Sequence, residues 1–231
     1  MKDNFPNIKQ KADSSACGPS CLQAIYKYYG KDLKLKMILE DLHIDKDTST
    51  YVSQLARHLN TNHLSTTLIS SNPFVVSPDW KAKPKKVVIK ELKEWILHHF
   101  NKGKVENIWI KEALYLLFYL QEGGNLKISN ITTDLIDKYL EDQNLILCCL
   151  AENWIWGKRK ISKVVEYDNI KGHVNGHFVI VYDKNKGDYQ ISDPYPTSIE
   201  NKEGLYAINK EELLTATLTW SHEILIVNNI K

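Results

Sequence analysis

The spacing of apolar residues follows a helical period through most of the chain and changes to strand-like runs in its last third. Ser14 or Ser15 is expected to cap a first helix, with Pro19 in its first turn and Gly30 at its C-terminal end. Between these signals apolar side chains recur at helical spacing, at Cys21, Leu22, Ile25, Tyr28 and Tyr29. We therefore predict a helix whose apolar side is buried in the centre of the protein.

The same pattern predicts further helices at residues 35–42, 50–59, 90–100, 105–121 and 135–140. Thr48 or Ser49 is a candidate cap for the second of these, and Thr132 or Thr133 for the last. Prolines among polar residues predict a connecting loop at 71–86.

The pattern changes after residue 144. Residues 145–150 form an unbroken apolar run, which is typical of a strand covered on both faces. Residues 177–182 and 189–193 are predicted to pair as a hairpin around the polar turn at 183–188, and residues 223–227 to form a final strand. Because helices come first and strands later, we predict an α+β protein rather than an alternating parallel sheet.

Composition places the chain among globular proteins. Its 231 residues are 43% hydrophobic and 25% charged, which suffices for a packed core. The 30 basic and 28 acidic residues leave a net charge of +2, which is too balanced to indicate a nucleic-acid partner. The densest basic run, at 81–90, is interrupted by Pro84 and is typical of a solvated loop. We predict one domain, residues 1–231, with a helical insertion or lid at about 71–130.

No segment of the sequence predicts export or a membrane span. The N-terminal residues lack the continuous apolar region of a secretory signal. The most apolar helical stretch, 108–120, carries Lys111 and Glu112 and is shorter than the ~20 residues that a span needs. The four cysteines, two of them adjacent, do not suggest a disulfide framework. These points predict a cytoplasmic protein.

Cys17 is the first candidate for chemistry. It stands at the start of the first predicted helix, where unpaired backbone N–H groups and the helix dipole favour a thiolate. Such a position lowers the pKa of a thiol from ~8.5 towards ~3.5–7.5. Gly18 follows it and permits close approach of backbone or substrate. A buried structural thiol is the alternative for a single cysteine, and we assign that role to Cys21, one turn deeper on the apolar stripe.

His177 and Asp193 are expected to meet on neighbouring strands. His177 begins the first strand of the predicted hairpin, and Asp193 ends the second, where Pro194 stops the pairing. The 193 − 177 = 16 residues between them enclose one hairpin, so the two side chains can reach each other. A purely structural His–Asp pair would produce the same pattern.

Taken together, three segments resemble the C39-like family of cysteine peptidases. Residues 13–22, with the sequence DSSACGPSCL, followed by Tyr28-Tyr29-Gly30, are similar to the active-site helix of that family. Residues 176–182 and 191–194 are similar to its histidine and aspartate motifs, in the same order. The resemblance implies a papain-like fold, in which an N-terminal helical lobe packs on an antiparallel β-sheet.

The resemblance also implies a Cys–His–Asp triad that hydrolyses a peptide or related amide through a thioester acyl-enzyme. Cys17 would be the nucleophile, His177 would hold and return the proton, and Asp193 would orient the imidazole. Family members usually carry a glutamine before the cysteine that helps to stabilise the oxyanion, and Gln10 is the match. It lies 17 − 10 = 7 residues before Cys17, one more than is usual in the family. The implied partner is a peptide or protein substrate, with no cofactor and no metal.

Several alternatives remain open. An acyltransferase or amide-forming enzyme would use the same triad with an amine in place of water. A non-catalytic peptide-binding module would keep only the scaffold. A zinc site of Cys17, Cys21, His173 and His177 has suitable ligand types, but residues four apart on a strand are poorly placed to chelate. The sequence does not indicate the oligomeric state.

Aromatic residues flank the predicted catalytic strands. Trp154, Trp156 and Tyr195 are expected either to form walls of a substrate cleft or to pack at the edge of the core.

Overall fold

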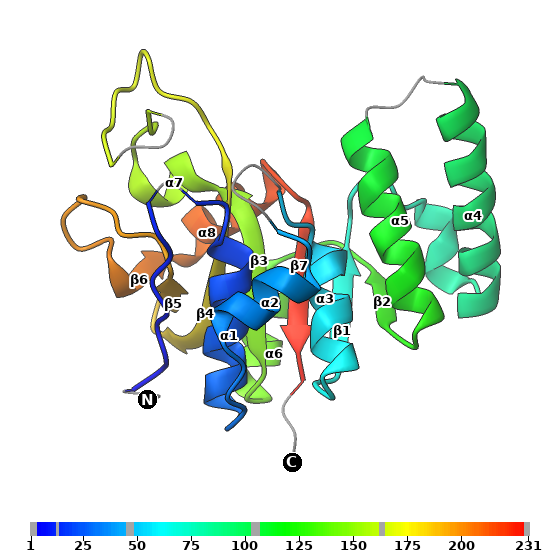
Figure 1. Cartoon of the computed structure of the whole chain (residues 1–231), viewed down its shortest axis with the longest axis horizontal. Coiled ribbons are helices and arrows are strands. Elements are labelled where there is room, and N and C mark those ends of the chain that lie inside the picture. The colour runs from blue at the N-terminus through cyan, green and yellow to red at the C-terminus, as the bar shows by residue number, and fades with distance from the viewer. Residues whose placement is uncertain (1–3, 13, 45–48, 103–106, 162–164, 229–231) are drawn as a thin grey trace.

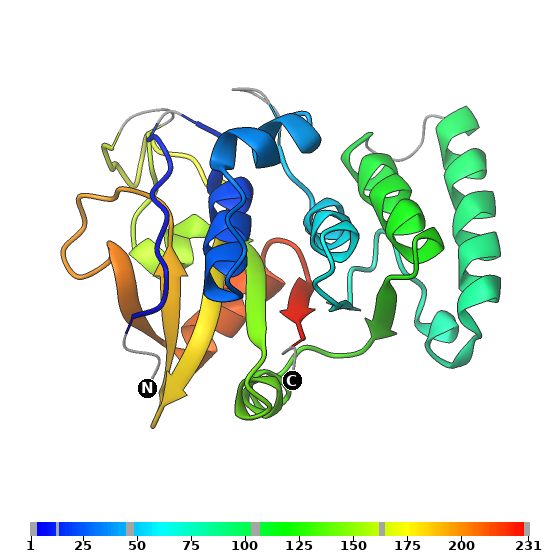
Figure 2. The same cartoon turned by 60° about the horizontal axis from the view of Figure 1, so that its bottom comes forward.

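The computed structural model describes residues 4–12, 14–44, 49–102, 107–161 and 165–228. Within this part the chain forms a seven-stranded sheet with helices on both faces (Figure 1, Figure 2). The strands are β1 (Thr66–Ser70), β2 (Asn125–Ile128), β3 (Leu145–Ala151), β4 (Gly176–Asn185), β5 (Asp188–Asp193), β6 (Gly204–Asn209) and β7 (Glu223–Val227). They lie in the order β2-β1-β7-β3-β4-β5-β6.

The helices lie on the two faces of this sheet and beside one of its edges. They are α1 (Cys17–Tyr28), α2 (Leu35–Asp41), α3 (Val52–Thr61), the 3₁₀ helix η1 (Pro78–Ala82), α4 (Lys85–Lys102), α5 (Asn107–Gln121), α6 (Thr133–Glu141), α7 (Glu152–Trp156) and α8 (Lys210–Leu218). One hydrophobic core joins α1 and α3 to one face, and a second joins α6, α7 and α8 to the other. The predicted α+β class and papain-like fold are confirmed, although β1 and β2 pair in parallel at one edge of the otherwise antiparallel sheet.

The strand β3 lies between the two cores, as its unbroken apolar run predicted. All seven of its residues are buried. Because strand side chains alternate between faces, Leu147 and Cys149 join the core on the α1 side, while Ile146 and Cys148 join the core on the other side. The central position of α1 is also confirmed, since Leu22 and Ile25 are fully buried.

The predicted serine cap of α1 is wrong. The N-cap residue is Ala16, which makes no side-chain capping hydrogen bond, and the Ser14 hydroxyl donates to the Lys11 carbonyl at 2.7 Å instead. No capping side chain therefore occupies the backbone N–H groups of the first turn of α1, and these groups remain available to an anion. The predicted end is confirmed: Gly30 has a φ of 72° and its N–H donates to the Lys27 carbonyl.

Two other predicted caps have different outcomes. Thr132 caps α6, because its hydroxyl accepts from the Leu135 N–H at 3.2 Å. Ser49 does not cap α3, whose N-cap is Tyr51, and Thr48 lies outside the described residues. Tyr51 takes this position because its N–H donates to the side chain of Gln54, in the first turn of α3, at 3.3 Å.

The predicted loop at 71–86, with its basic run, is partly helical. Pro78 lies at the start of η1, and the Pro84 carbonyl accepts the first bond of α4, from the Val87 N–H at 2.8 Å. Proline is tolerated at the beginning of a helix because the N–H that it lacks would have no acceptor there. The prolines therefore begin helical turns here rather than mark a loop. β1, β2, β6, α7 and α8 were not predicted from the sequence.

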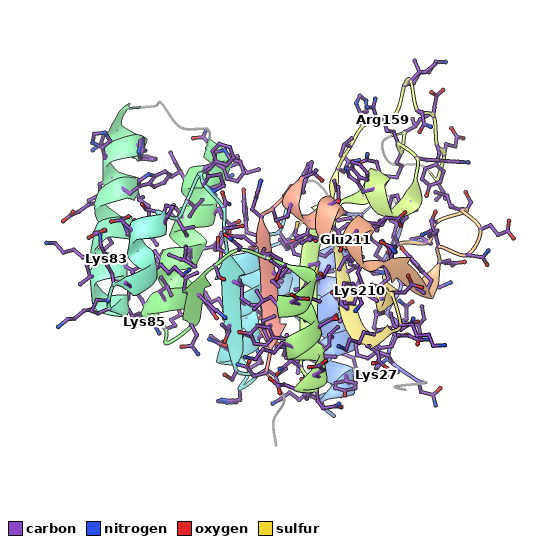
Figure 3. The ribbon with its side chains drawn as sticks, turned by 180° about the vertical axis from the view of Figure 1, so that it is seen from behind. Lys27, Lys83, Lys85, Arg159, Lys210 and Glu211 are labelled. Carbon is purple, nitrogen blue, oxygen red and sulfur yellow. The ribbon has the colours of Figure 1, made fainter. Side chains whose placement is uncertain are left out.

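α4 and α5 lie beside one edge of the sheet, within the region predicted to be an insertion or lid (Figure 1, Figure 2). Charged side chains near this helical pair include Lys83, which lies between η1 and α4, and Lys85, the first residue of α4 (Figure 3). Lys83 pairs with Asp79 at 2.6 Å and with Glu91 at 2.8 Å. The single-domain organisation with a lid stays a prediction. None of the helices in the described ranges combines the length and the apolar character needed to cross a membrane.

Candidate active site

Cys17 is the first residue of α1 and is partly exposed. α3 approaches α1 closely behind it. A Cβ atom at Gly18 would lie 2.7 Å from the Thr50 hydroxyl oxygen and 2.9 Å from a Leu55 methyl group. The absence of a side chain at Gly18 therefore allows the two helices to approach each other beside the thiol.

His177 and Asp193 meet at the end of the sheet where α1 begins. His177 is the second residue of β4 and Asp193 is the last of β5. Their side chains are 3% and 0% exposed, and His177 Nε2 lies 2.7 Å from Asp193 Oδ1. The second ring nitrogen, Nδ1, is therefore left for the Cys17 thiol, which is hydrogen-bonded to this imidazole.

Four groups hold the Asp193 carboxylate. Oδ1 contacts His177 and accepts from the Tyr195 backbone N–H at 2.9 Å. Oδ2 accepts from the Tyr206 hydroxyl at 2.8 Å and from the Trp156 indole N–H at 3.2 Å. Burial raises the pKa of Tyr206 well above its ordinary value, and the nearby Asp193 charge raises it further, so the phenol remains a donor. These contacts fix the carboxylate and, through it, the plane of the imidazole.

The thiol and the imidazole favour their charged forms together. Burial by itself would raise the pKa of Cys17, but the hydrogen bond and the charge of His177, with the backbone N–H groups of Phe178 and Gly18, lower it below its ordinary value. Burial by itself would lower the pKa of His177, but the charges and hydrogen bonds of Asp193 and Cys17 raise it to about 10. Both shifts act in the direction that favours a thiolate–imidazolium pair.

The other cysteines behave differently. The Cys21 thiol donates to the Phe178 carbonyl at 3.4 Å, and burial raises its pKa well above the ordinary value. Burial raises the pKa of Cys148 to about 12 and that of Cys149 well above its ordinary value. Among the four cysteines, only Cys17 has a pKa shifted towards the thiolate form.

Gln10 lies at the edge of the same site. Its backbone N–H donates to the Pro194 carbonyl at 2.9 Å, which ties the N-terminal segment to the end of β5. Its side-chain Nε2 donates to the Ser14 carbonyl at 3.0 Å. A primary amide carries two N–H bonds, so one remains for another acceptor. Residue 13, the first position of the 13–22 motif, lies outside the described residues.

A cavity of about 650 Å³ lies beside the Cys17 and His177 side chains. Its lining includes the aromatic side chains of Tyr195, Trp220 and, from α5, Trp109. The Trp220 indole lies directly over Gly176, where a Cβ atom would be 2.2 Å from its Nε1. Of the aromatic residues expected near the strands, Tyr195 lines the cavity and Trp156 holds Asp193, whereas Trp154 is half-exposed and does not line it.

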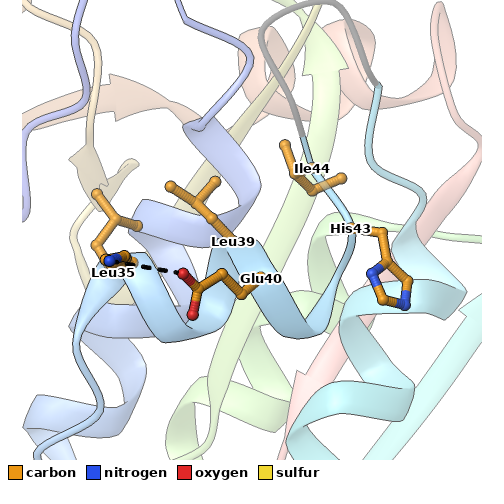
Figure 4. A pocket seen from close by; sticks show the side chains of 6 residues that line it. Leu35, Leu39, Glu40, His43 and Ile44 are labelled. Carbon is orange, nitrogen blue, oxygen red and sulfur yellow. Dashed lines mark ion pairs between the residues drawn. The ribbon is translucent and has the colours of Figure 1, made fainter.

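A second hollow, of about 600 Å³, lies along α2 (Figure 4). Leu39 and Ile44 line it, together with Glu40, which pairs with Lys36 at 3.8 Å. It has no thiol and no imidazole–carboxylate pair. The cavity beside Cys17 is therefore the candidate active site.

The zinc alternative finds no support in the side-chain positions. Cys21 is bonded to a backbone carbonyl in the core, and His177 is bonded to Asp193. In the ranges that the structure describes, no three His, Cys, Asp or Glu side chains are grouped so that they could hold a metal ion.

Comparison with known proteins agrees with the resemblance seen in the motifs. The sequence model of the Peptidase C39 family matches residues 5–109. A solved structure described as a C39-like peptidase from Bacillus anthracis is similar over 100% of this chain and 98% of its own, with a TM-score of 0.51 and 10% identity, which shows a shared fold. The predicted resemblance to the C39-like family is thereby confirmed.

Another solved structure is similar over 98% of this chain and 100% of its own, with a TM-score of 0.46 and 12% identity. It is the peptidase domain of Streptococcus ComA, described as a bifunctional ABC transporter involved in a quorum-sensing pathway. No curated protein matches the chain significantly.

The lowered pKa of Cys17 can be tested by alkylation. At pH 6 an ordinary thiol is less than ~1% thiolate, so iodoacetamide is expected to modify Cys17 and to leave Cys21, Cys148 and Cys149 unmodified. Mass spectrometry of the digested protein locates the label. In a His177→Ala variant the rate at pH 6 is expected to fall by at least ~10-fold, because the imidazolium that stabilises the thiolate is lost. An unchanged rate would contradict the thiolate–imidazolium pair.

Proposed function

We propose that this chain, which shares the fold and an N-terminal sequence signature of the C39 peptidase family, is a cysteine peptidase with Cys17 as its nucleophile. The observation that supports the proposal most directly is a pair of hydrogen bonds, one between the Cys17 thiol and His177 and the other between His177 and Asp193. These three groups come from α1, β4 and β5 and converge beside a cavity large enough for several residues of a peptide.

The reaction follows from the charges of the pair. The Cys17 thiolate attacks the carbonyl carbon of the scissile amide, and the carbonyl oxygen becomes an oxyanion. The His177 imidazolium gives its proton to the departing amine, which leaves a thioester on Cys17 and a neutral imidazole. That imidazole then takes a proton from water, the resulting hydroxide attacks the thioester, and the acid product leaves with the thiolate restored.

Asp193 acts through His177 as a positioning residue. Its bond to Nε2 keeps Nδ1 turned toward the thiol and stabilises the imidazolium form. Since the carboxylate is itself held by Tyr206 and Trp156, the imidazole is oriented before a substrate binds.

Two donors are candidates for the oxyanion. As the first residue of α1, Cys17 has a backbone N–H without an acceptor in its own helix. The free N–H of the Gln10 amide is the second candidate, since Gln10 lines the cavity together with Cys17. One such donor contributes about 3–4 kcal/mol to transition-state stabilisation.

Substitution of the cysteines tests the nucleophile. Cys17→Ala is expected to abolish turnover of fluorogenic peptide pools while the far-UV circular dichroism spectrum is retained. The matched variant Cys21→Ala, one turn along the same helix, is expected to keep most of the activity and to lose roughly 1–2 kcal/mol of stability, because it removes only a buried sulfur. Turnover by the Cys17→Ala protein would refute the mechanism. Adding a small amine such as hydroxylamine shows in the same assay whether the acyl group is transferred to amines.

The pH profile tests Asp193. The wild-type kcat/KM is expected to rise as Cys17 ionises, at a pH below the ordinary pKa of a thiol, and to fall again at about pH 10, where the His177 imidazolium loses its proton. In Asp193→Asn the charge that favours the imidazolium is gone, so the falling limb is expected to move towards neutral pH and kcat to drop by ~10²-fold or more. A falling limb that stayed in place would show that Asp193 does not support His177.

A further inference from the structure

Three glutamates line the candidate active-site cavity, and they differ in how their charge is compensated. Glu152 Oε1 accepts from the Asn175 side chain at 2.7 Å, and Lys160 Nζ lies 3.5 Å from its Oε2. Glu112 and Glu223 have no basic partner anywhere in the described residues, although they are 7% and 1% exposed. Buried carboxyl groups in proteins are normally paired. These two are therefore unusual.

Glu223 lies close to the catalytic strands. In the sheet, Cys148 of β3 pairs with Ile224 of β7, so the next residues of these two strands, Cys149 and Glu223, are neighbours. The opposite edge of β3 faces β4, where Cys149 pairs with Phe178. Two strand spacings, about 10 Å, therefore separate the backbone of Glu223 from the strand that carries His177. By alternation Glu223 is on the α1 side of the sheet, as Cys149 is.

Glu112 reaches the same place from the opposite side. It belongs to α5, and its Oε1 accepts from the Ser53 hydroxyl at 2.6 Å. Ser53 is in the first turn of α3, the helix that approaches Gly18 behind the nucleophile. The charges of Cys17, Glu112 and Glu223 all act on the buried Cys149 thiol, so the two carboxyl groups and the Cys17 thiol lie within electrostatic range of one side chain.

Neutral hydroxyl groups are the only side-chain donors that the described residues supply to this pair. Ser53 donates to Glu112, and Ser70 donates to Oε1 of Glu223 at 2.8 Å. Burial raises the pKa of Glu112 to about 7. Burial, with repulsion from Glu112, raises the pKa of Glu223 well above its ordinary value. Both carboxyl groups therefore ionise less readily than ordinary ones, and a cation bound beside them would lower both pKa values and stabilise their charged forms.

Further polar groups of the cavity lining are also without a partner. The Tyr195 hydroxyl and Gln10 Oε1 have no hydrogen bond in the described part of the chain, although both residues are more than nine-tenths buried. A ligand with several hydrogen-bonding groups in this cavity would account for them together with the uncompensated carboxyl groups.

We propose that Glu112 and Glu223 form a specificity subsite for a positively charged side chain, lysine or arginine, of the peptide substrate. The inference rests on the proposed function and names the substrate class of that same site. Since a peptide advances about 3.3–3.6 Å per residue, a subsite about 10 Å from the catalytic strand reads a residue within about three positions of the scissile bond. Glu152, which already has Lys160, does not take part.

Hydrolysis of peptide pools tests the subsite. N-acetylated fluorogenic hexapeptides carry lysine, arginine, norleucine or citrulline at one position near the scissile bond, with the other positions randomised. The wild type is expected to cleave the lysine or arginine pools at least ~10-fold faster in kcat/KM than the neutral pools of similar shape. In Glu223→Gln and in Glu112→Gln/Glu223→Gln this ratio is expected to fall towards 1, while cleavage of the norleucine pool remains.

The control is Glu94→Gln, an exposed position on α4 of the same helical pair, which is expected to keep the wild-type ratio. A further set of norleucine peptides has a free N-terminus. If these peptides are cleaved as fast as the lysine pools while the acetylated norleucine peptides are not, the subsite binds an N-terminal amine, and the proposal of a side-chain subsite is overturned. A wild-type ratio near 1, or an unchanged ratio in the double variant, also overturns it.

Binding separates this proposal from the proposed function. In the Cys17→Ala protein, which cannot turn over, titration calorimetry with the lysine and norleucine pools measures the preference directly. A preference of at least ~10-fold that disappears in Cys17→Ala/Glu223→Gln supports the subsite even if the wild type hydrolyses no peptide, in which case the peptidase proposal alone fails. Equal binding of both pools overturns the subsite whatever the hydrolysis assays show.

Discussion

The chemistry of the candidate site depends on the hydrogen bond between Asp193 and His177. This bond sets which imidazole nitrogen faces the Cys17 thiol. The charge of Asp193 offsets the effect of burial, which would otherwise keep the imidazole neutral. The bond is buried, so water does not compete with it. Asp193 in turn depends on Tyr206 and Trp156, which come from β6 and α7 on the face of the sheet away from α1. The second core thus supports the site electrostatically as well as sterically.

Two departures from ordinary packing rules occur at this end of the sheet. α1 begins without a side-chain cap, which leaves its first backbone N–H groups free to stabilise an anion at Cys17. The cavity wall contains two buried carboxyl groups, Glu112 and Glu223, that have no basic partner among the residues the structure describes. A fold that needed only stability would have placed a serine or aspartate at the cap and apolar side chains in the wall. Departures of this kind are expected where a protein binds or transforms a ligand.

Local sequence signals accounted for much of the fold. The continuous apolar run predicted β3, the glycine after an apolar stripe predicted the end of α1, and Thr132 predicted the start of α6. The failures have physical reasons. Prolines that began helical turns were interpreted as loop residues. β2 and β6 lie at the two edges of the sheet and keep exposed positions, so burial does not impose on them a continuous apolar run like that of β3.

By itself the sequence determined which residues have suitable chemistry and where the elements that carry them begin: a thiol at a helix start, a histidine at a strand start and an aspartate at a strand end. Only the tertiary structure decided what surrounds them. No local period in the sequence predicts that Tyr206 donates to Asp193, or that Glu112 of α5 and Glu223 of β7 line the same cavity. Contacts between distant segments arise from the packing of whole elements, and burial and neighbouring charges then set the proton affinities.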